Sequence, residues 1–141
     1  MEKKELNFWQ DHSLRYLEMA FGTDRREVLE NPDGYGKRTG DCGDTVEIFL
    51  QMAEGHIAAV AFETNGCLNT AACANTVGHL AEGKTPTEAW EITPEDVIAY
   101  LETLPPENNH CAELAVGALY LALRDLKATG RDPWKRGYRK R

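Results

Sequence analysis

The fold is decided by residues 45–64, which read TVEIFLQMAEGHIAAVAFET. Apolar and polar side chains alternate over residues 45–52, with only Phe49 out of phase, and a period of two is typical of a half-buried strand. Glu54-Gly55 then provides a tight turn before a second apolar, β-branched run over residues 56–64. The stretch therefore predicts an antiparallel hairpin.

Helices and a loop are predicted before this hairpin. Residues 6–21 carry apolar side chains at helical spacing and are followed by a glycine, which favours a helix end. Asp24 can cap a short second helix, with Glu27 three residues on, that ends at Asn31-Pro32. The glycine-rich residues 33–36 then predict a turn or loop.

Helices alone are predicted after the hairpin. Alanine-rich residues 71–83 indicate a helix of about four turns, which a glycine closes. Thr85 and Thr93 are each followed by a proline and, three residues on, by an acid, which is the pattern of a capped helix start. Two helices are therefore predicted to begin there, and Pro105-Pro106 ends the second of them. A last helix is predicted over residues 109–127. The element order predicts an α+β domain with helices packed on one face of a small antiparallel sheet of two to three strands.

Composition limits the class of protein. A chain of 141 residues with 42% hydrophobic residues suits one globular domain, and no apolar run approaches the roughly 20 residues that span a bilayer. The N-terminus lacks a secretory signal pattern, so we expect a cytoplasmic protein with no membrane association. Residues 131–141 hold six basic side chains and one acid, whereas the other 130 residues hold ten basic and 22 acidic side chains, a net charge of −12. An acidic body argues against nucleic-acid binding.

The four cysteines are the candidate functional residues of this chain. In a reducing cytosol, cysteines in glycine-flanked loops and at helix starts bind metal or carry out sulfur chemistry more often than they form disulfides. Cys42 lies in the loop before the hairpin, Cys67 follows Asn65-Gly66, and Cys111 begins the last helix. Helix starts stabilise anions, so we expect Cys67 and Cys111 to be accessible and to have lowered pKa values.

Asp44 and His110 are the candidate partners of these thiols. Asp44 follows Cys42-Gly43, and a carboxylate beside thiolates suits a metal that is exchanged rather than held permanently; the alternative is that Asp44 only caps a turn. His110 could bind iron or zinc. Because adjacent helical residues point about 100° apart, we do not expect His110 to activate Cys111 directly, which argues against a Cys–His hydrolase.

The hairpin explains how distant cysteines could meet. The chain has no Cys-x-x-Cys hook of the kind found in common zinc modules. Cys42 leads into the hairpin and Cys67 leads out of it, so two strands of similar length bring both to one end of the sheet, where Cys111 could close a site. Cys73 lies six positions beyond Cys67, a rotation of about 600°, and is predicted to be a small buried residue outside the site.

These motifs together resemble the U-type iron–sulfur cluster scaffold family, whose usual names are IscU and the N-terminal domain of NifU. The resemblance rests on Cys42-Gly43-Asp44, residues 64–67, Leu104-Pro105-Pro106 and His110-Cys111, and spans residues 30–125. It implies a SufE/IscU-like fold and a non-catalytic assembly platform.

The resemblance also implies ligands and partners. A cysteine desulfurase would deliver sulfur and a separate donor would deliver iron, and a 2Fe–2S cluster would form on Cys42, Cys67 and Cys111 before passing to apo-proteins. Asp44 would keep the cluster labile, His110 would be an alternative ligand, and zinc could occupy the same site.

Three regions depart from the family pattern. The usual Gly-Ser after the middle cysteine reads Leu68-Asn69, and Cys73 is an additional thiol. The family's Leu-Pro-Pro-Val-Lys, recognised by an Hsp70-type chaperone, reads Leu-Pro-Pro-Glu-Asn over residues 104–108, which argues against transfer through such a chaperone. Residues 1–22 have no clear counterpart and are interpreted as a helical extension that either packs on the domain or mediates association, for example as a homodimer. The predicted division is thus an extension over 1–22, a scaffold domain over 23–128 and a basic tail over 129–141.

Two other functions compete with the cluster scaffold. One is a zinc-dependent sulfur acceptor of the related SufU type, which typically carries an insertion between the second and third cysteines and lacks the histidine before the last. The other is a structural zinc protein, although such a site normally has four strong ligands.

Overall fold

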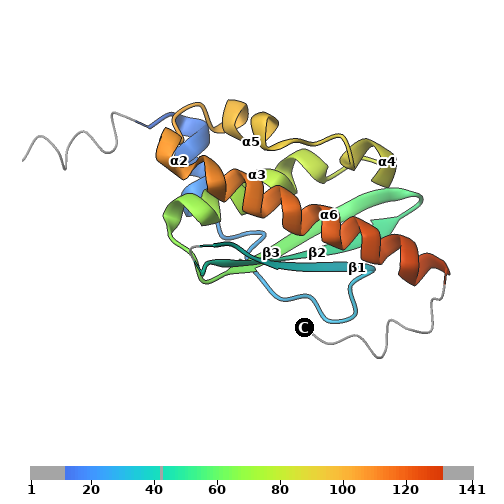
Figure 1. Ribbon diagram of the computed structural model, residues 1–141. Helices are drawn as coiled ribbons and strands as arrows, with labels where there is room; N and C mark the ends of the chain where they lie inside the picture. Colours follow the sequence, from blue (N-terminus) through green and yellow to red (C-terminus); the bar gives the residue numbers. More distant parts are fainter. Residues whose placement is uncertain (1–11, 42, 132–141) are drawn as a thin grey trace, which may run out of the picture.

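The computed structural model describes residues 12–41 and 43–131 and contains a three-stranded antiparallel sheet in the order β1-β2-β3 (Figure 1). The strands are β1 (Gly34–Thr39), β2 (Thr45–Ala53) and β3 (His56–Thr64). The predicted hairpin is β2-β3. Its turn residues Glu54 and Gly55 have φ values of 54° and 82°, as the tight hairpin turn requires.

The glycine-rich stretch before the hairpin is a strand, so the prediction of a turn or loop over residues 33–36 was wrong. The reason is the packing of β1 against α6 (Asn109–Arg131). A Cβ atom on Gly36 would lie 2.3 Å from the Ala118 carbonyl oxygen, and one on Gly34 would lie 2.7 Å from that of Ala122. These glycines therefore allow a close strand–helix approach, which a sequence pattern alone cannot distinguish from turn chemistry.

The segment between α2 (Leu14–Phe21) and β1 also differs from the prediction. No helix forms between Asp24 and Pro32. Instead Arg26 makes an isolated parallel bridge to Phe62 of β3, with the Phe62 N–H donating to the Arg25 carbonyl at 2.8 Å. Pairing the free N–H and C=O groups of the β3 edge outweighs the local capping pattern.

The later helices begin where the sequence indicates. Thr85 and Thr93 each form a complete capping box, with Glu88 and Asp96 respectively. The elements after the sheet are α3 (Leu68–Ala81), α4 (Pro86–Ala89), α5 (Pro94–Leu101), a 3-10 turn η1 (Pro106–Asn108) and α6. In the described part of the chain, no helix combines the length and apolar character needed to cross a membrane.

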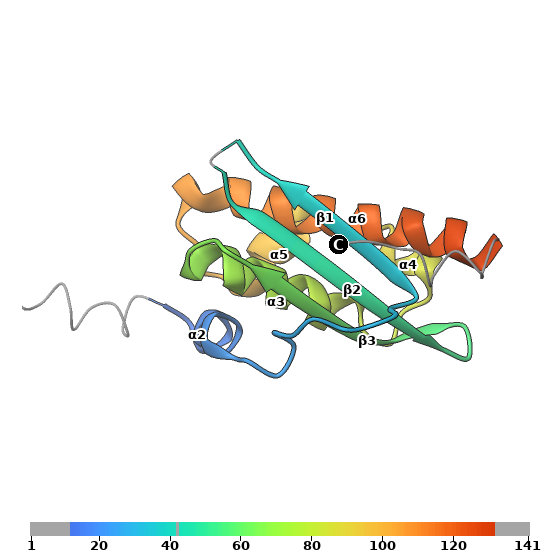
Figure 2. The same cartoon turned by 90° about the horizontal axis from the view of Figure 1, so that it is seen from below.

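The helices form layers above the sheet. Figure 1 shows α3 and α6 on one face of the sheet and α5 beyond them, and the view from below in Figure 2 shows the sheet in front of both helices. Sheet residues Ile48 and Leu50 are fully buried in this layer, as are Val77 of α3 and Leu119 of α6. Each such side chain contributes about 1.5–3 kcal/mol by leaving water. The α+β prediction with helices on one face is confirmed.

Candidate functional site

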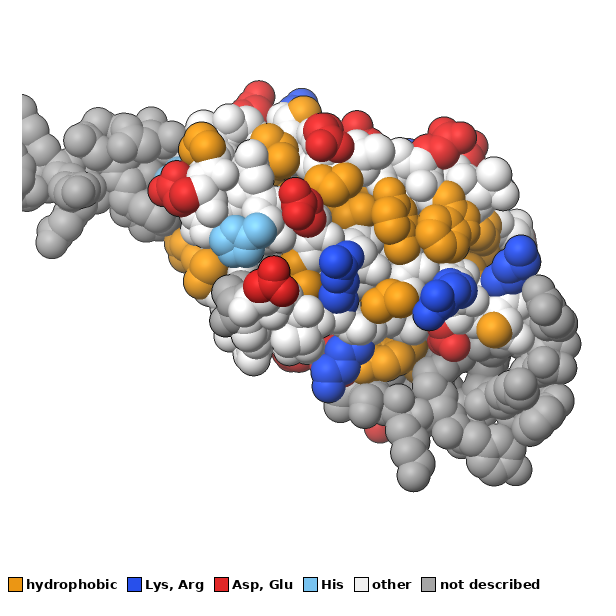
Figure 3. Space-filling view, viewed as in Figure 1, with side chains coloured by type: hydrophobic (Ala, Val, Ile, Leu, Met, Phe, Trp, Pro, Cys, Tyr) orange, Lys and Arg blue, Asp and Glu red, His pale blue; other side chains and the backbone are white. Residues whose placement is uncertain are grey.

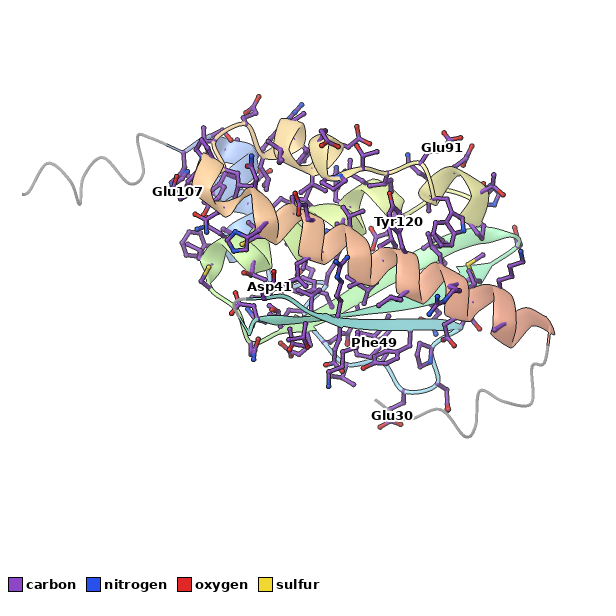
Figure 4. The ribbon with its side chains drawn as sticks, viewed as in Figure 1. Glu30, Asp41, Phe49, Glu91, Glu107 and Tyr120 are labelled. Carbon is purple, nitrogen blue, oxygen red and sulfur yellow. The ribbon has the colours of Figure 1, made fainter. Side chains whose placement is uncertain are left out.

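Four of the predicted site residues lie at one end of the sheet, where β1 joins β2 and where α3 and α6 begin: Asp44, Cys67, His110 and Cys111. Cys42 lies outside the described residues. Its neighbours form a tight turn, in which the Gly40 N–H donates to the Asp44 carbonyl at 2.8 Å and the Gly43 N–H donates to the Gly40 carbonyl at 3.0 Å. Figure 4 shows Asp41 in this turn and Glu107 just before α6 at the same end of the molecule.

Cys67 is the N-cap residue of α3 and is exposed to solvent. The loop before it is held by Asn65, whose side-chain oxygen accepts from the Thr45 N–H at 2.7 Å. Partial burial would raise the pKa of the Cys67 thiol. The N–H groups of Thr70 and Asn69 and the Thr70 hydroxyl outweigh this burial, so the pKa lies below its ordinary value. The expectation of an accessible, activated thiol at a helix start is confirmed for Cys67.

Cys111 behaves differently. It lies in the first turn of α6 but is only 1% exposed. Burial raises the pKa of its thiol, and hydrogen bonds from Thr70 and Asn108 offset this only in part. The expectation of an accessible Cys111 with a lowered pKa was therefore wrong, because packing of the first turn of α6 against the domain excludes the water that the helix-start argument assumes.

His110 lies closer to the thiol than the helix geometry suggested. Its Nε2 atom is 3.7 Å from the Cys111 Sγ atom, although adjacent residues leave a helix in different directions. His110 itself is exposed to solvent. His110 thus lies within contact distance of the Cys111 thiol, and its role as an alternative ligand stays a prediction.

One residue that sequence reasoning missed connects the predicted group. The hydroxyl oxygen of Thr70 lies 3.2 Å from Asp44 Oδ2, 3.4 Å from Cys111 Sγ and 3.7 Å from Cys67 Sγ. The available signal was its spacing, three residues after Cys67 on the same face of a helix. The structure therefore brings Asp44, Cys67 and Cys111 around one hydroxyl group.

The donors do not surround a metal position in this arrangement. Within 12–41 and 43–131, no group of three or more His, Cys, Asp or Glu side chains lies in a geometry that could hold a metal ion. The donor types themselves, thiol, imidazole and carboxylate, are those that iron and zinc use in proteins. A ligand set here would need Cys42 or a movement of the side chains now held by Thr70.

Cys73 lies deeper in α3 and is fully buried. Burial raises the pKa of its thiol. The prediction of a small buried residue is confirmed.

Tyr16 of α2, which the sequence did not single out, donates a hydrogen bond from its hydroxyl to Asn69 Oδ1 at 2.5 Å. Burial, with the neighbouring thiols, raises the pKa of Tyr16 to about 12. In this way α2 packs beside the beginning of α3.

A cleft of about 360 Å³ lies next to the residues that surround Thr70, between the β1-β2 turn and α6. Its lining includes Arg38, Asp41, His110 and Glu113. Arg38 lies against Gly117, where an added Cβ would approach its guanidinium to 1.9 Å. Figure 3 shows acidic side chains and a histidine toward the site end of this face, and lysine and arginine side chains farther along it.

Comparison with known proteins supports the resemblance. The family model described as "NifU-like N terminal domain" matches residues 27–131. The chain is 35% identical to the iron–sulfur cluster assembly scaffold protein IscU 1 of Archaeoglobus fulgidus over 98 residues, which cover 69% of this chain and 64% of that protein. It is 35% identical to IscU of Buchnera aphidicola over 124 residues, which cover 78% of this chain and 96% of that protein.

Solved structures agree on the fold. A NifU-like N-terminal protein from Brucella abortus superposes with a TM-score of 0.66 at 20% identity, covering 82% of this chain and 94% of that one. A structure described as a putative SUF-system scaffold, from Fervidobacterium islandicum, gives a TM-score of 0.65 at 21% identity, covering 81% and 97%. The matched model covers most of the chain, and its span includes the group around Thr70; the chain therefore belongs to the family of NifU-like N-terminal domains.

Proposed function

We propose that this chain is a scaffold on which an iron–sulfur cluster is assembled and from which it is transferred. The observation that supports this most directly is the convergence of Asp44, Cys67 and Cys111 on one hydroxyl at the end of the sheet. These residues come from three separate segments, and Gly40 and Asp44, which flank Cys42 in the sequence, are joined by a backbone hydrogen bond. Relatives named as cluster scaffolds support the same assignment.

The donor set suits a cargo that is held and then released. Cys42, Cys67 and Cys111 would supply thiolates to a 2Fe–2S cluster, with Asp44 as an oxygen ligand and His110 as an alternative. Oxygen is a harder donor than thiolate and binds iron of this kind less firmly, so Asp44 would keep the cluster exchangeable. The same donors fit zinc, which would compete for the site.

The two proposed ligand thiols that the structure describes are suited to different tasks. Cys67 is exposed and has a lowered pKa, whereas Cys111 is buried and has a raised pKa. Sulfur transfer requires an accessible thiolate that attacks the outer sulfur of a desulfurase persulfide, takes that sulfur and releases the desulfurase thiolate. Cys67 would therefore accept sulfur first, and Cys111 would act as a ligand once iron is present.

The partners follow from this assignment. A cysteine desulfurase would supply sulfur, a separate donor would supply iron, and apo-proteins would receive the cluster in the cytoplasm. The scaffold itself would catalyse no reaction. Residues 23–128 would form the scaffold domain, with 1–22 as an extension and 129–141 as a basic tail.

Anaerobic incubation with ferrous iron, cysteine and a desulfurase tests the proposal. The protein should develop the visible absorption bands of a bound cluster, and Cys67→Ser should lose them. Cys73→Ser is the matched control, because Cys73 is buried on the same helix, and it should keep them. Retention of zinc with no visible bands would contradict the scaffold and favour a zinc-dependent sulfur acceptor.

A further inference from the structure

Thr70 lies at the centre of the candidate site without being a candidate ligand in the family resemblance. Its side chain is fully buried in the first turn of α3. Its hydroxyl oxygen contacts Asp44 at 3.2 Å, Cys111 at 3.4 Å and Cys67 at 3.7 Å. The buried hydroxyl therefore has hydrogen-bond partners, and all of them are proposed ligands.

The hydrogen-bonding capacity of the hydroxyl matches these three neighbours. A threonine hydroxyl offers one donor and two acceptor positions. Thr70 donates to the Asp44 carboxylate, which uses its only proton. In the two sulfur contacts either atom can be the donor, so the hydroxyl accepts from a protonated thiol or donates to a thiolate in place of Asp44. All three contacts can form at the same time while both thiols are protonated.

The backbone accounts for this placement. Cys67 is the N-cap of α3 and Thr70 follows three residues later, so both side chains face the same end of the helix. Packing of α3 against α6 brings Cys111 into contact with the hydroxyl, and Asp44, directly before β2, contacts it as well. The hydroxyl thus lies where segments separated by 26 and 41 residues meet.

We propose that Thr70 is a positioning residue that holds Asp44, Cys67 and Cys111 together in the unloaded protein, in place of the cargo. The inference rests on the proposed function, since it assigns Thr70 a part in preparing that site. Loading would exchange the contacts to the hydroxyl for bonds to the metal. Because the three side chains are already gathered, fewer rotamers are lost when a metal binds.

The test is anaerobic titration of the reduced full chain with Co²⁺ alone, in the unsubstituted protein and in Thr70→Ser and Thr70→Ala. These two variants differ only in the hydroxyl. Thr70→Ser should bind Co²⁺ within about twofold of the unsubstituted chain, whereas Thr70→Ala should bind about tenfold more weakly. The thiolate-to-cobalt absorption per bound ion should also fall in Thr70→Ala and return in Thr70→Ser.

Thr76→Val is the matched control. Thr76 is buried on the same helix, and its hydroxyl donates only to the Ala72 carbonyl at 2.8 Å among the described contacts. It should leave the Co²⁺ affinity and spectrum unchanged. If Thr70→Ala does not fold, as circular dichroism would show, Thr70→Val keeps the branched shape without the hydroxyl and should show the same loss.

Several results would overturn the inference. They are equal affinity and spectra for the Ser and Ala variants, tighter binding by the Ala variant, an equal loss in Thr76→Val, or no Co²⁺ binding by the unsubstituted chain. The cluster experiment is separate from this titration. A protein that binds Co²⁺ in a Thr70-dependent way but forms no cluster would contradict the scaffold function and leave the role of Thr70 intact.

Discussion

Replacing Glu82 with Gln should destabilise the protein near neutral pH, because Glu82 ties the segment after α2 to α3 and β3. Its carboxylate accepts from Arg25 Nε at 3.0 Å and Nη2 at 2.6 Å, and from the Val60 N–H at 3.2 Å. Arg25 also donates to Asn75 Oδ1 at 3.0 Å. The segment held in this way is the one that forms a bridge to β3 instead of a helix.

The size of the effect follows from burial and geometry. A two-pronged arginine–carboxylate contact is among the stronger polar interactions, but the Arg25 and Glu82 side chains remain 20% and 30% exposed, so water screens part of the attraction. A glutamine keeps the shape and loses the charge. We expect a loss of about 1–2 kcal/mol in the free energy of unfolding, equivalent to a melting temperature lower by about 3–8 °C in a chain of this size.

The pH dependence gives the sharper assay. Burial would raise the pKa of Glu82, but the hydrogen bonds and charge of Arg25 and the Val60 N–H outweigh it, and the pKa lies below its ordinary value. A carboxyl group whose pKa is depressed on folding stabilises the protein above its unfolded pKa of about 4.3 and loses this contribution as the pH falls through the folded pKa. The difference in melting temperature between the two proteins should therefore be full at pH 7 and shrink below about pH 4.

Two results would refute this reasoning. One is a difference between Glu82→Gln and the unsubstituted protein that stays constant from pH 7 to pH 3, and the other is no difference at pH 7. Glu91→Gln is the control, since Glu91 is exposed and lies at the surface near α4 (Figure 4). It should change the free energy of unfolding by no more than about 0.5 kcal/mol.

Three further predictions concern the site and its support. Iodoacetamide should alkylate Cys67 well before Cys111 in the folded protein, and the alkylation rate of Cys67 should rise at a lower pH than that of an ordinary thiol. Peptide mass spectrometry measures the alkylation of each cysteine. Equal rates for the two cysteines would contradict the assigned burial and pKa directions. Gly36→Ala places a Cβ 2.3 Å from a carbonyl oxygen of α6 and should cost about 1–3 kcal/mol or more in a urea unfolding experiment, whereas exposed Lys37→Ala should cost little. Asp44→Ala should slow the loss of a reconstituted cluster to a chelator, because it removes an exchangeable oxygen ligand, and unchanged release kinetics would count against that role.

Most of the secondary structure was predictable from local patterns. The β2-β3 hairpin follows from alternation and from a turn whose glycine accepts a positive φ. The helices after Thr85 and Thr93 begin at capping boxes that span four residues. Such signals act between neighbours in the chain, so they can be read without knowing what packs against them.

Two local interpretations failed because a distant segment competed with them. The capping pattern at Asp24 indicated a helix, but Phe62 at the β3 edge pairs its N–H with the Arg25 carbonyl and its carbonyl with the Glu27 N–H. The glycines before the hairpin indicated a loop, but they serve the contact of β1 with α6. In both cases a partner far along the chain outweighed a local preference of about 1 kcal/mol.

For the candidate site too, some features can be predicted from the sequence and others depend on the tertiary structure. The residue types, their order and the position of Cys67 at a helix start can all be read along the chain, and they suffice for the family resemblance and for the lowered pKa of that thiol. The burial of Cys111 and the place of Thr70 between Asp44 and two thiols arise only when α3, α6 and the β1-β2 turn pack together. Helix caps and turns depend on backbone groups a few residues apart, whereas desolvation depends on every atom that surrounds a group, and most of those atoms belong to other segments.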